Sequence, residues 1–149
     1  MFDVFGEMET AAEINDVARS LKEEGEKENL DKLCAENGID AELAELFWNE
    51  EIDFITDQTM AAVGKLDIEI KEAKGDTAYL ESIANFLKAE AAKGDQMAVS
   101  IRKKGKTLKN AYKAVETEAR KRKGSGNCVV MRDKDVFEIV KKVLQRVRT

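Results

Sequence analysis

The chain of 149 residues contains no proline. Average usage of about 5% would give roughly seven prolines in a chain of this length. Because proline breaks the interior of a helix, its absence favours long, uninterrupted helices. Apolar residues make up 43% of the sequence, which is enough to build a sizeable core in one domain. We therefore expect a single helical domain that spans residues 1–149.

Capping signals and apolar residues at helical spacing divide most of the chain into helices. Thr10 and Glu13 form a capping box before a predicted helix near 11–24, and Gly38 is expected to end a short second helix. Other predicted helices begin at aspartate caps, and one begins at Thr107 after a break at Gly105. The aspartate caps are Asp40, Asp76, Asp95 and Asp133.

The third helix, which follows Asp40, is expected to carry Leu43, Phe47 and Phe54 on its apolar side. The segment 59–74 continues the helical pattern and fits an extension of this helix, because no breaker separates the two. Cys128-Val-Val-Met131 is short, apolar and β-branched, so it fits one short strand or a buried extended segment. The predicted fold class is all-α, mainly a helical bundle.

Several functional classes lack the residues that they need. The chain has no histidine, which is the commonest general base and metal ligand. Gly105-Lys106-Thr107 resembles the end of a phosphate-binding P-loop, but Ser100 stands where the first glycine of that motif belongs. No serine or cysteine has a partner base in a recognisable motif. We predict no enzyme activity, no catalytic residue, no metal site and no cofactor.

The expected compartment is the cytoplasm. Cys34 and Cys128 match no zinc or redox spacing, so buried reduced thiols are expected. No apolar run approaches the ~18 residues of a membrane span, and the first ten residues are acidic. We expect neither a signal peptide nor contact with a membrane.

Charge is divided along the chain, although the net value is only −5. Residues 1–57 carry 18 acidic and 4 basic side chains, a net charge of −14. Residues 76–149 carry 9 acidic and 18 basic side chains, a net charge of +9. Fields of one sign on this scale govern steering and the choice of partner rather than the fold. This division points to a protein that acts on other macromolecules, at least one of them a polyelectrolyte.

The basic residues between Ile101 and Lys123 are candidate contacts to nucleic acid, although a solvated helix face would look the same. Lys103, Lys104 and Lys106 crowd a predicted helix N-terminus, where cations oppose the helix dipole and a bound phosphate would favour them. Most aromatic residues of this half sit at core spacing, so backbone contact is favoured over base stacking. The candidates are Arg102, Lys103, Lys104, Lys106, Lys109, Lys113, Arg120, Lys121, Arg122 and Lys123.

The acidic half also allows two interpretations. Its carboxylates either keep the helices soluble or imitate a phosphate backbone and dock on a basic channel of a nucleic-acid enzyme. Spacing alone does not separate the two. The candidate partner-binding residues are Glu42, Glu45, Glu50, Glu51 and Asp53.

Six blocks of sequence that run in order along nearly the whole chain resemble the PcfK-like proteins of mobile genetic elements. The blocks are Met1–Glu7, Ala11–Asn15, Ala35–Asp40, Ala61–Lys65, Val99–Lys109 and Cys128–Asp133. Some members of that group are anti-CRISPR proteins that inhibit type II-A RNA-guided nucleases. The resemblance implies inhibition by binding and carries over no catalytic residue.

The residues and the resemblance lead to the same expectation. The leading hypothesis is a stoichiometric inhibitor that binds a type II CRISPR effector nuclease with its guide RNA. Contact with DNA as well is left open. One alternative is a plasmid or conjugation accessory protein that binds DNA directly. The other is a helical adaptor without nucleic-acid contact. The oligomeric state and the step that is blocked stay open.

Overall fold

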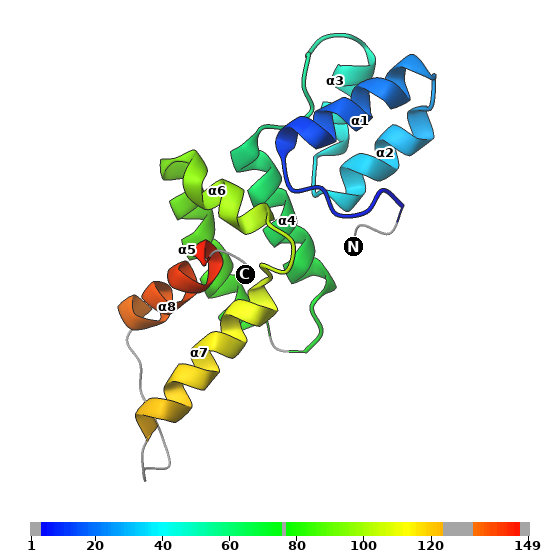
Figure 1. Ribbon diagram of the computed structural model, residues 1–149. Coiled ribbons are helices and arrows are strands. Elements are labelled where there is room, and N and C mark those ends of the chain that lie inside the picture. Colours follow the sequence, from blue (N-terminus) through cyan, green and yellow to red (C-terminus); the bar gives the residue numbers. More distant parts are fainter. Residues whose placement is uncertain (1–3, 76, 124–132, 147–149) are drawn as a thin grey trace.

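A computed structural model describes residues 4–75, 77–123 and 133–146 of the chain (Figure 1). These residues form eight α-helices and no strand, which confirms the predicted all-α class. The segment Cys128–Met131, where a strand was one of two predictions, lies outside the described residues. The helices are α1 (Ala11–Glu23), α2 (Lys27–Glu36), α3 (Ala41–Trp48), α4 (Gln58–Glu72), α5 (Ala78–Lys93), α6 (Asp95–Arg102), α7 (Leu108–Lys123) and α8 (Asp133–Gln145).

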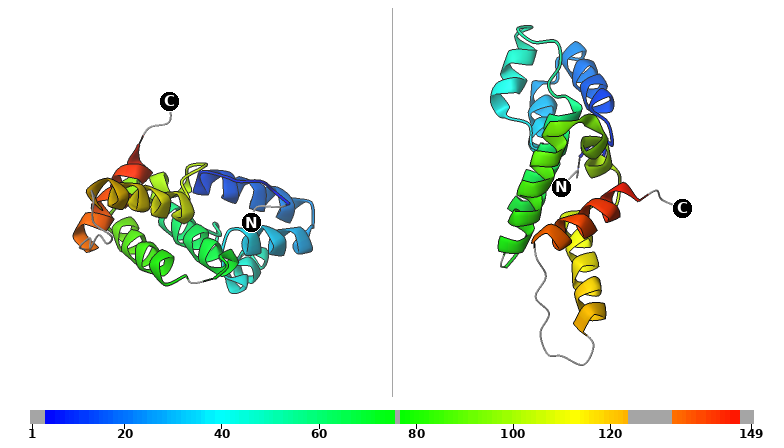
Figure 2. Two further views of the ribbon diagram at one scale, coloured as in Figure 1. Left: turned by 90° about the horizontal axis from the view of Figure 1, so that it is seen from below. Right: turned by 90° about the vertical axis from the view of Figure 1, so that its left-hand side faces the viewer.

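The core consists of two clusters that meet within α4. The N-terminal cluster joins α1, α2 and α3 and reaches Ala61, whereas the C-terminal cluster begins at Ala62 and joins α4 to α8. Figures 1 and 2 show α1–α3 at one end of an elongated molecule and α7 with α8 at the other. We call α1–α3 with the loop 49–57 the acidic end, and α7 with α8 the basic end. The division of charge in the sequence therefore follows the packing of the fold.

Some of the predicted caps are confirmed, and others are wrong by one residue. The Thr10 side chain accepts a hydrogen bond from the backbone N–H of Glu13, and Asp40 accepts one from Glu42. Asp95 is not a cap, because Gly94 holds the cap position of α6 and Asp95 is already helical. Thr77 rather than Asp76 holds the cap position of α5, and Asp133 is already the first residue of α8, so these two predicted caps are wrong as well.

The predicted continuation of the third helix into α4 is wrong. Helix α3 ends at Trp48, and Glu50 follows with a φ of 64°, in the left-handed region that most side chains avoid. The buried side chain of Asn15 in α1 then holds the loop extended, since its Oδ1 accepts from Ile55 N at 2.9 Å and its Nδ2 donates to Thr56 O at 3.0 Å. The loop consequently leaves Phe54, which was expected on the apolar face, 58% exposed.

Candidate nucleic-acid interface

The two clusters are joined by a tight backbone contact between the α2–α3 turn and α4. A Cβ atom on Gly64 would overlap the carbonyl oxygen of Asn37, and one on Gly38 would overlap the backbone of Gly64. Gly38 also has a φ of +66°, which favours glycine. Only glycine at both positions allows the two backbones to touch.

Arg102 lies at this junction and is fully buried. Its guanidinium donates hydrogen bonds to the carbonyl oxygens of Met8 and Ala61 and, at 2.9 Å, to Oδ1 of Asn37. Burial lowers the pKa of the guanidinium, and the charges of Glu7 and Glu13 oppose this shift. The predicted role of Arg102 in phosphate contact is therefore corrected, because its side chain joins three segments of the fold and does not reach the surface.

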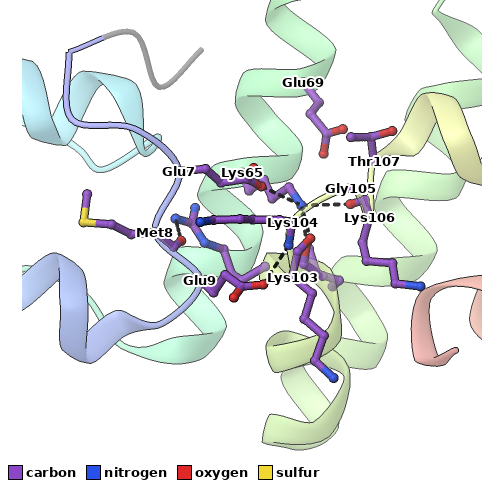
Figure 3. Close-up of polar contacts among 12 residues, drawn as sticks. Glu7, Met8, Glu9, Lys65, Glu69, Lys103, Lys104, Gly105, Lys106 and Thr107 are labelled. Atoms are coloured by element: carbon purple, nitrogen blue, oxygen red, sulfur yellow. Dashed lines mark hydrogen bonds and ion pairs between the residues drawn. The ribbon is translucent and has the colours of Figure 1, made fainter. Parts of the chain in front are cut away.

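Lys65 of α4 is a second fully buried cation beside it. Its Nζ donates to the carbonyl oxygens of Ile101, Lys103 and Lys106, as the dashed lines in Figure 3 mark. Glu7 lies 3.8 Å from the same nitrogen. Burial lowers the pKa of Lys65, whereas Glu69 and Glu7 raise it. The loop between α6 and α7 thus wraps around a lysine ammonium of α4.

Two carboxylates of the protein accept hydrogen bonds from backbone N–H groups of this loop. Glu69 of α4 accepts from Leu108 N, the first residue of α7, at 2.9 Å, and Glu9 accepts from Lys104 N at 2.8 Å. An anion therefore already sits where the lysines crowd the helix N-terminus, and it belongs to the chain itself. No bound phosphate is needed to explain the lysines at this terminus, because Glu69 offsets the unfavourable position of the cations.

The remaining basic candidates fall into three groups. Lys106 is half-buried, and its Nζ donates to Val143 O in the last turn of α8 at 2.9 Å. The side chains of Arg122 and Lys123 lie outside the described residues. The others are exposed on the loop or on α7, and Arg120 forms a 3.6 Å ion pair with Glu116. These exposed residues, which we call the basic surface, are Lys103, Lys104, Lys109, Lys113, Arg120 and Lys121.

The five acidic candidates are all exposed, but they lie in different settings. Glu45 on α3 forms an ion pair with Lys27, and Glu50 lies 3.4 Å from Lys22. Glu42 lies in the first turn of α3, while Glu51 and Asp53 belong to the loop that follows the helix. Asp53 and Glu50 also line a groove of about 760 Å³, which is bordered by Arg19 and Phe54. The structure thus brings the loop carboxylates together and pairs two of the five with lysines.

Sequence reasoning missed the residues that hold this region in place. Lys65 and Glu69 stand four residues apart in a segment that was interpreted only by its apolar pattern. The sequence offers one signal for them. Residues four positions apart lie on the same face of a helix, so an oppositely charged pair on a face that also packs against the core indicates a buried pair of charges. Most aromatic residues of the basic half were expected at core positions, and Tyr79, which is 67% exposed, is an exception.

Three other features bear on function in the described part of the chain: its cysteine, groups that could hold a metal ion, and helices that could cross a membrane. Cys34 is buried and unbonded, as predicted, and burial raises the pKa of its thiol to about 12. No group of three or more His, Cys, Asp or Glu side chains there could hold a metal ion, and no helix there is long and apolar enough to cross a membrane. The chain matches no protein-family model, no curated protein and no solved structure.

Proposed function

We propose that this protein is a non-catalytic inhibitor of a type II CRISPR effector nuclease, and that it acts in the cytoplasm by stoichiometric binding. The observation that carries the proposal is the placement of opposite charges at opposite ends of one helical molecule. Buried contacts from Arg102 and Lys65 join the N-terminal part of the chain to α4, α6 and the loop before α7, so the two ends would engage a partner together.

The chemistry of the proposed partner fits both ends. A type II effector holds its guide–target heteroduplex in a positively charged channel. The carboxylates of the acidic end would dock on that protein surface, and the basic surface on α7 would contact guide RNA or target DNA. The resemblance to PcfK-like proteins supports the same partner.

A cleavage assay tests the proposal. A purified type II nuclease loaded with guide RNA is titrated with this protein, and the loss of target cleavage is expected to be complete near one inhibitor per nuclease. Inhibition that persists far below that ratio would indicate catalysis and contradict the proposal. The protein alone should cut neither DNA nor RNA.

The same preparation separates the alternatives. Full cleavage together with salt-dependent retention of DNA by the protein alone would favour an accessory protein that binds DNA directly. Full cleavage without any retention would leave a helical adaptor that does not contact nucleic acid. Both results would overturn the proposed inhibitor.

A further inference from the structure

A hollow of about 750 Å³ opens where the end of α4 and the starts of α5 and α7 meet. Its lining includes Tyr79 and Tyr112, which are the only two tyrosines of the chain. The centroids of their rings are 5.9 Å apart, and their planes are tilted by 33°. Tyr112 packs against the C-terminal cluster, whereas Tyr79 is 67% exposed. The half-buried ring of Tyr112 therefore supports an open aromatic face at the mouth of the hollow.

Cations flank this aromatic face on the side of α7. Lys109 lines the hollow, as does Lys74 from the end of α4, and both are exposed. Lys113 follows Lys109 by one helical turn, which places their Cβ atoms about 5–6 Å apart. Glu69 and Glu72 line the hollow from α4 and would repel a phosphate within it. The charges therefore place the phosphates outside the hollow, on the Lys109 and Lys113 side of α7, and leave the hollow to an uncharged base.

We propose that this hollow binds an unpaired base of a single-stranded nucleic acid. The base stacks on Tyr79, and its flanking phosphates lie at Lys109 and Lys113. The inference rests on the proposed contact between the basic end and nucleic acid, and it names the class of ligand as single-stranded. It departs from the expectation from the sequence, which favoured backbone contact over base stacking.

The physical basis is the exposure of the base faces. In a duplex the faces of the bases are covered by their neighbours, whereas in a single strand any base offers a flat π-face to an aromatic side chain. The hollow lies within the range of roughly 300–1,000 Å³ that is typical of small-molecule sites, so a nucleobase fits it. The ring of Tyr79 packs on Tyr112, and about two thirds of its surface stays open to solvent, where a base can reach it.

The two tyrosines also provide the readout. Trp48 is the only tryptophan and lies in α3, at the acidic end, so a Trp48→Phe variant leaves tyrosine as the source of emission. Titration of this variant with a single-stranded oligonucleotide should quench the tyrosine emission, and a duplex of the same sequence should quench it far less. Affinity is measured in parallel by the anisotropy of a fluorescein-labelled strand.

Substitutions separate stacking from charge. Tyr79→Ala should weaken binding of the single strand by about tenfold or more, whereas Tyr79→Phe, which keeps the ring, should bind nearly as well as the native chain. Val99→Ala removes an exposed apolar side chain elsewhere and serves as the matched control.

The outcomes distinguish this inference from the proposed function. Native affinity in Tyr79→Ala, or equal quenching by single strand and duplex, would overturn the stacking site. The proposed contact between the basic surface and nucleic acid would stand. The absence of any binding would overturn both the stacking site and the proposed contact with nucleic acid. If single strands quench the emission, Tyr79→Ala abolishes the quenching and the protein does not inhibit the nuclease, the stacking site is supported and the proposed inhibitor is overturned.

Discussion

Gly64 lies where the backbone of α4 touches the α2–α3 turn, and a methyl group at this residue has no free space. We predict that Gly64→Ala lowers the free energy of unfolding by about 1–3 kcal/mol, because the added Cβ meets backbone atoms of Asn37 and Gly38 in the α2–α3 turn. Urea denaturation followed by circular dichroism measures this change. Gly94→Ala is the control, since no atom lies within 4 Å of a Cβ there. It should cost at most about 1 kcal/mol, through a poorer helix cap. Equal effects of the two substitutions would contradict the close contact at Gly64.

At the level of single helices, the carboxylate of Glu69 controls the start of α7. Burial raises its pKa, the Leu108 N–H and Lys65 oppose the shift, and Glu7 adds to it. Because the pKa in the folded protein lies above the ordinary value of 4.5, the native state binds this proton more tightly than the unfolded chain does. The contribution of Glu69 to stability is therefore fully present below pH 4.5 and falls as the pH rises through the raised value.

Glu69→Gln should remove this dependence while keeping an acceptor for Leu108 N–H. We expect the stability of the variant, relative to the native protein, to improve as the pH rises from about 4 to about 8. The attraction between ionised Glu69 and Lys65 is already part of the pKa shift of Glu69, so its loss is included in the expected trend. Urea denaturation at several pH values measures the difference. Glu72→Gln, one turn further along the exposed side of α4, should show no such trend, and a flat difference for Glu69→Gln would contradict the assignment.

The individual helices differ in how far they could be predicted. Apolar spacing was sufficient to predict α1, α2 and α5–α8, because this signal lies within each helix, whereas the first residues of α5, α6 and α8 differ from the predicted caps by about one position. The break between α3 and α4 could not be predicted, since Asn15 imposes it from about 40 residues away through hydrogen bonds to Ile55 and Thr56. The exposed lysines of α7 followed from helical spacing. The burial of Arg102 did not, because its acceptors come from Met8, Asn37 and Ala61, which only the folded chain brings together.

Over the whole molecule, the basic surface should bind phosphates in proportion to its charge. We predict that Lys109→Glu combined with Lys113→Glu weakens binding to single-stranded nucleic acid and flattens its logarithmic salt dependence by about 0.7 per lost phosphate contact. The combined reversal of Lys32 and Lys71 makes the same change in net charge on exposed residues outside the basic end. Filter binding at several salt concentrations measures the slope. An equal loss of affinity in both variants would show that only net charge matters.

The acidic end should act on the rate of association. Neutralising Glu42, Glu51 and Asp53 to glutamine or asparagine is expected to slow association with the nuclease and to make the on-rate less sensitive to ionic strength. The fold should survive, because all three side chains are exposed. Stopped-flow or surface-based kinetics measure the rate. Neutralising Glu81, Asp95 and Glu138, which are exposed outside the acidic end, is the matched control, and equal slowing by both sets would contradict a specific docking role.

The separation of charge along an elongated fold also affects how the molecule meets copies of itself. A body that is negative at one end and positive at the other is an electric dipole, and two such bodies attract when the acidic end of one faces the basic end of the next. A head-to-tail contact of this kind leaves one charged end free on each molecule of a pair, so it can propagate into open chains of molecules unless a ring closes. Because salt screens the attraction over about 10 Å at 0.1 M, dilute buffers should favour these chains and physiological salt should disperse them.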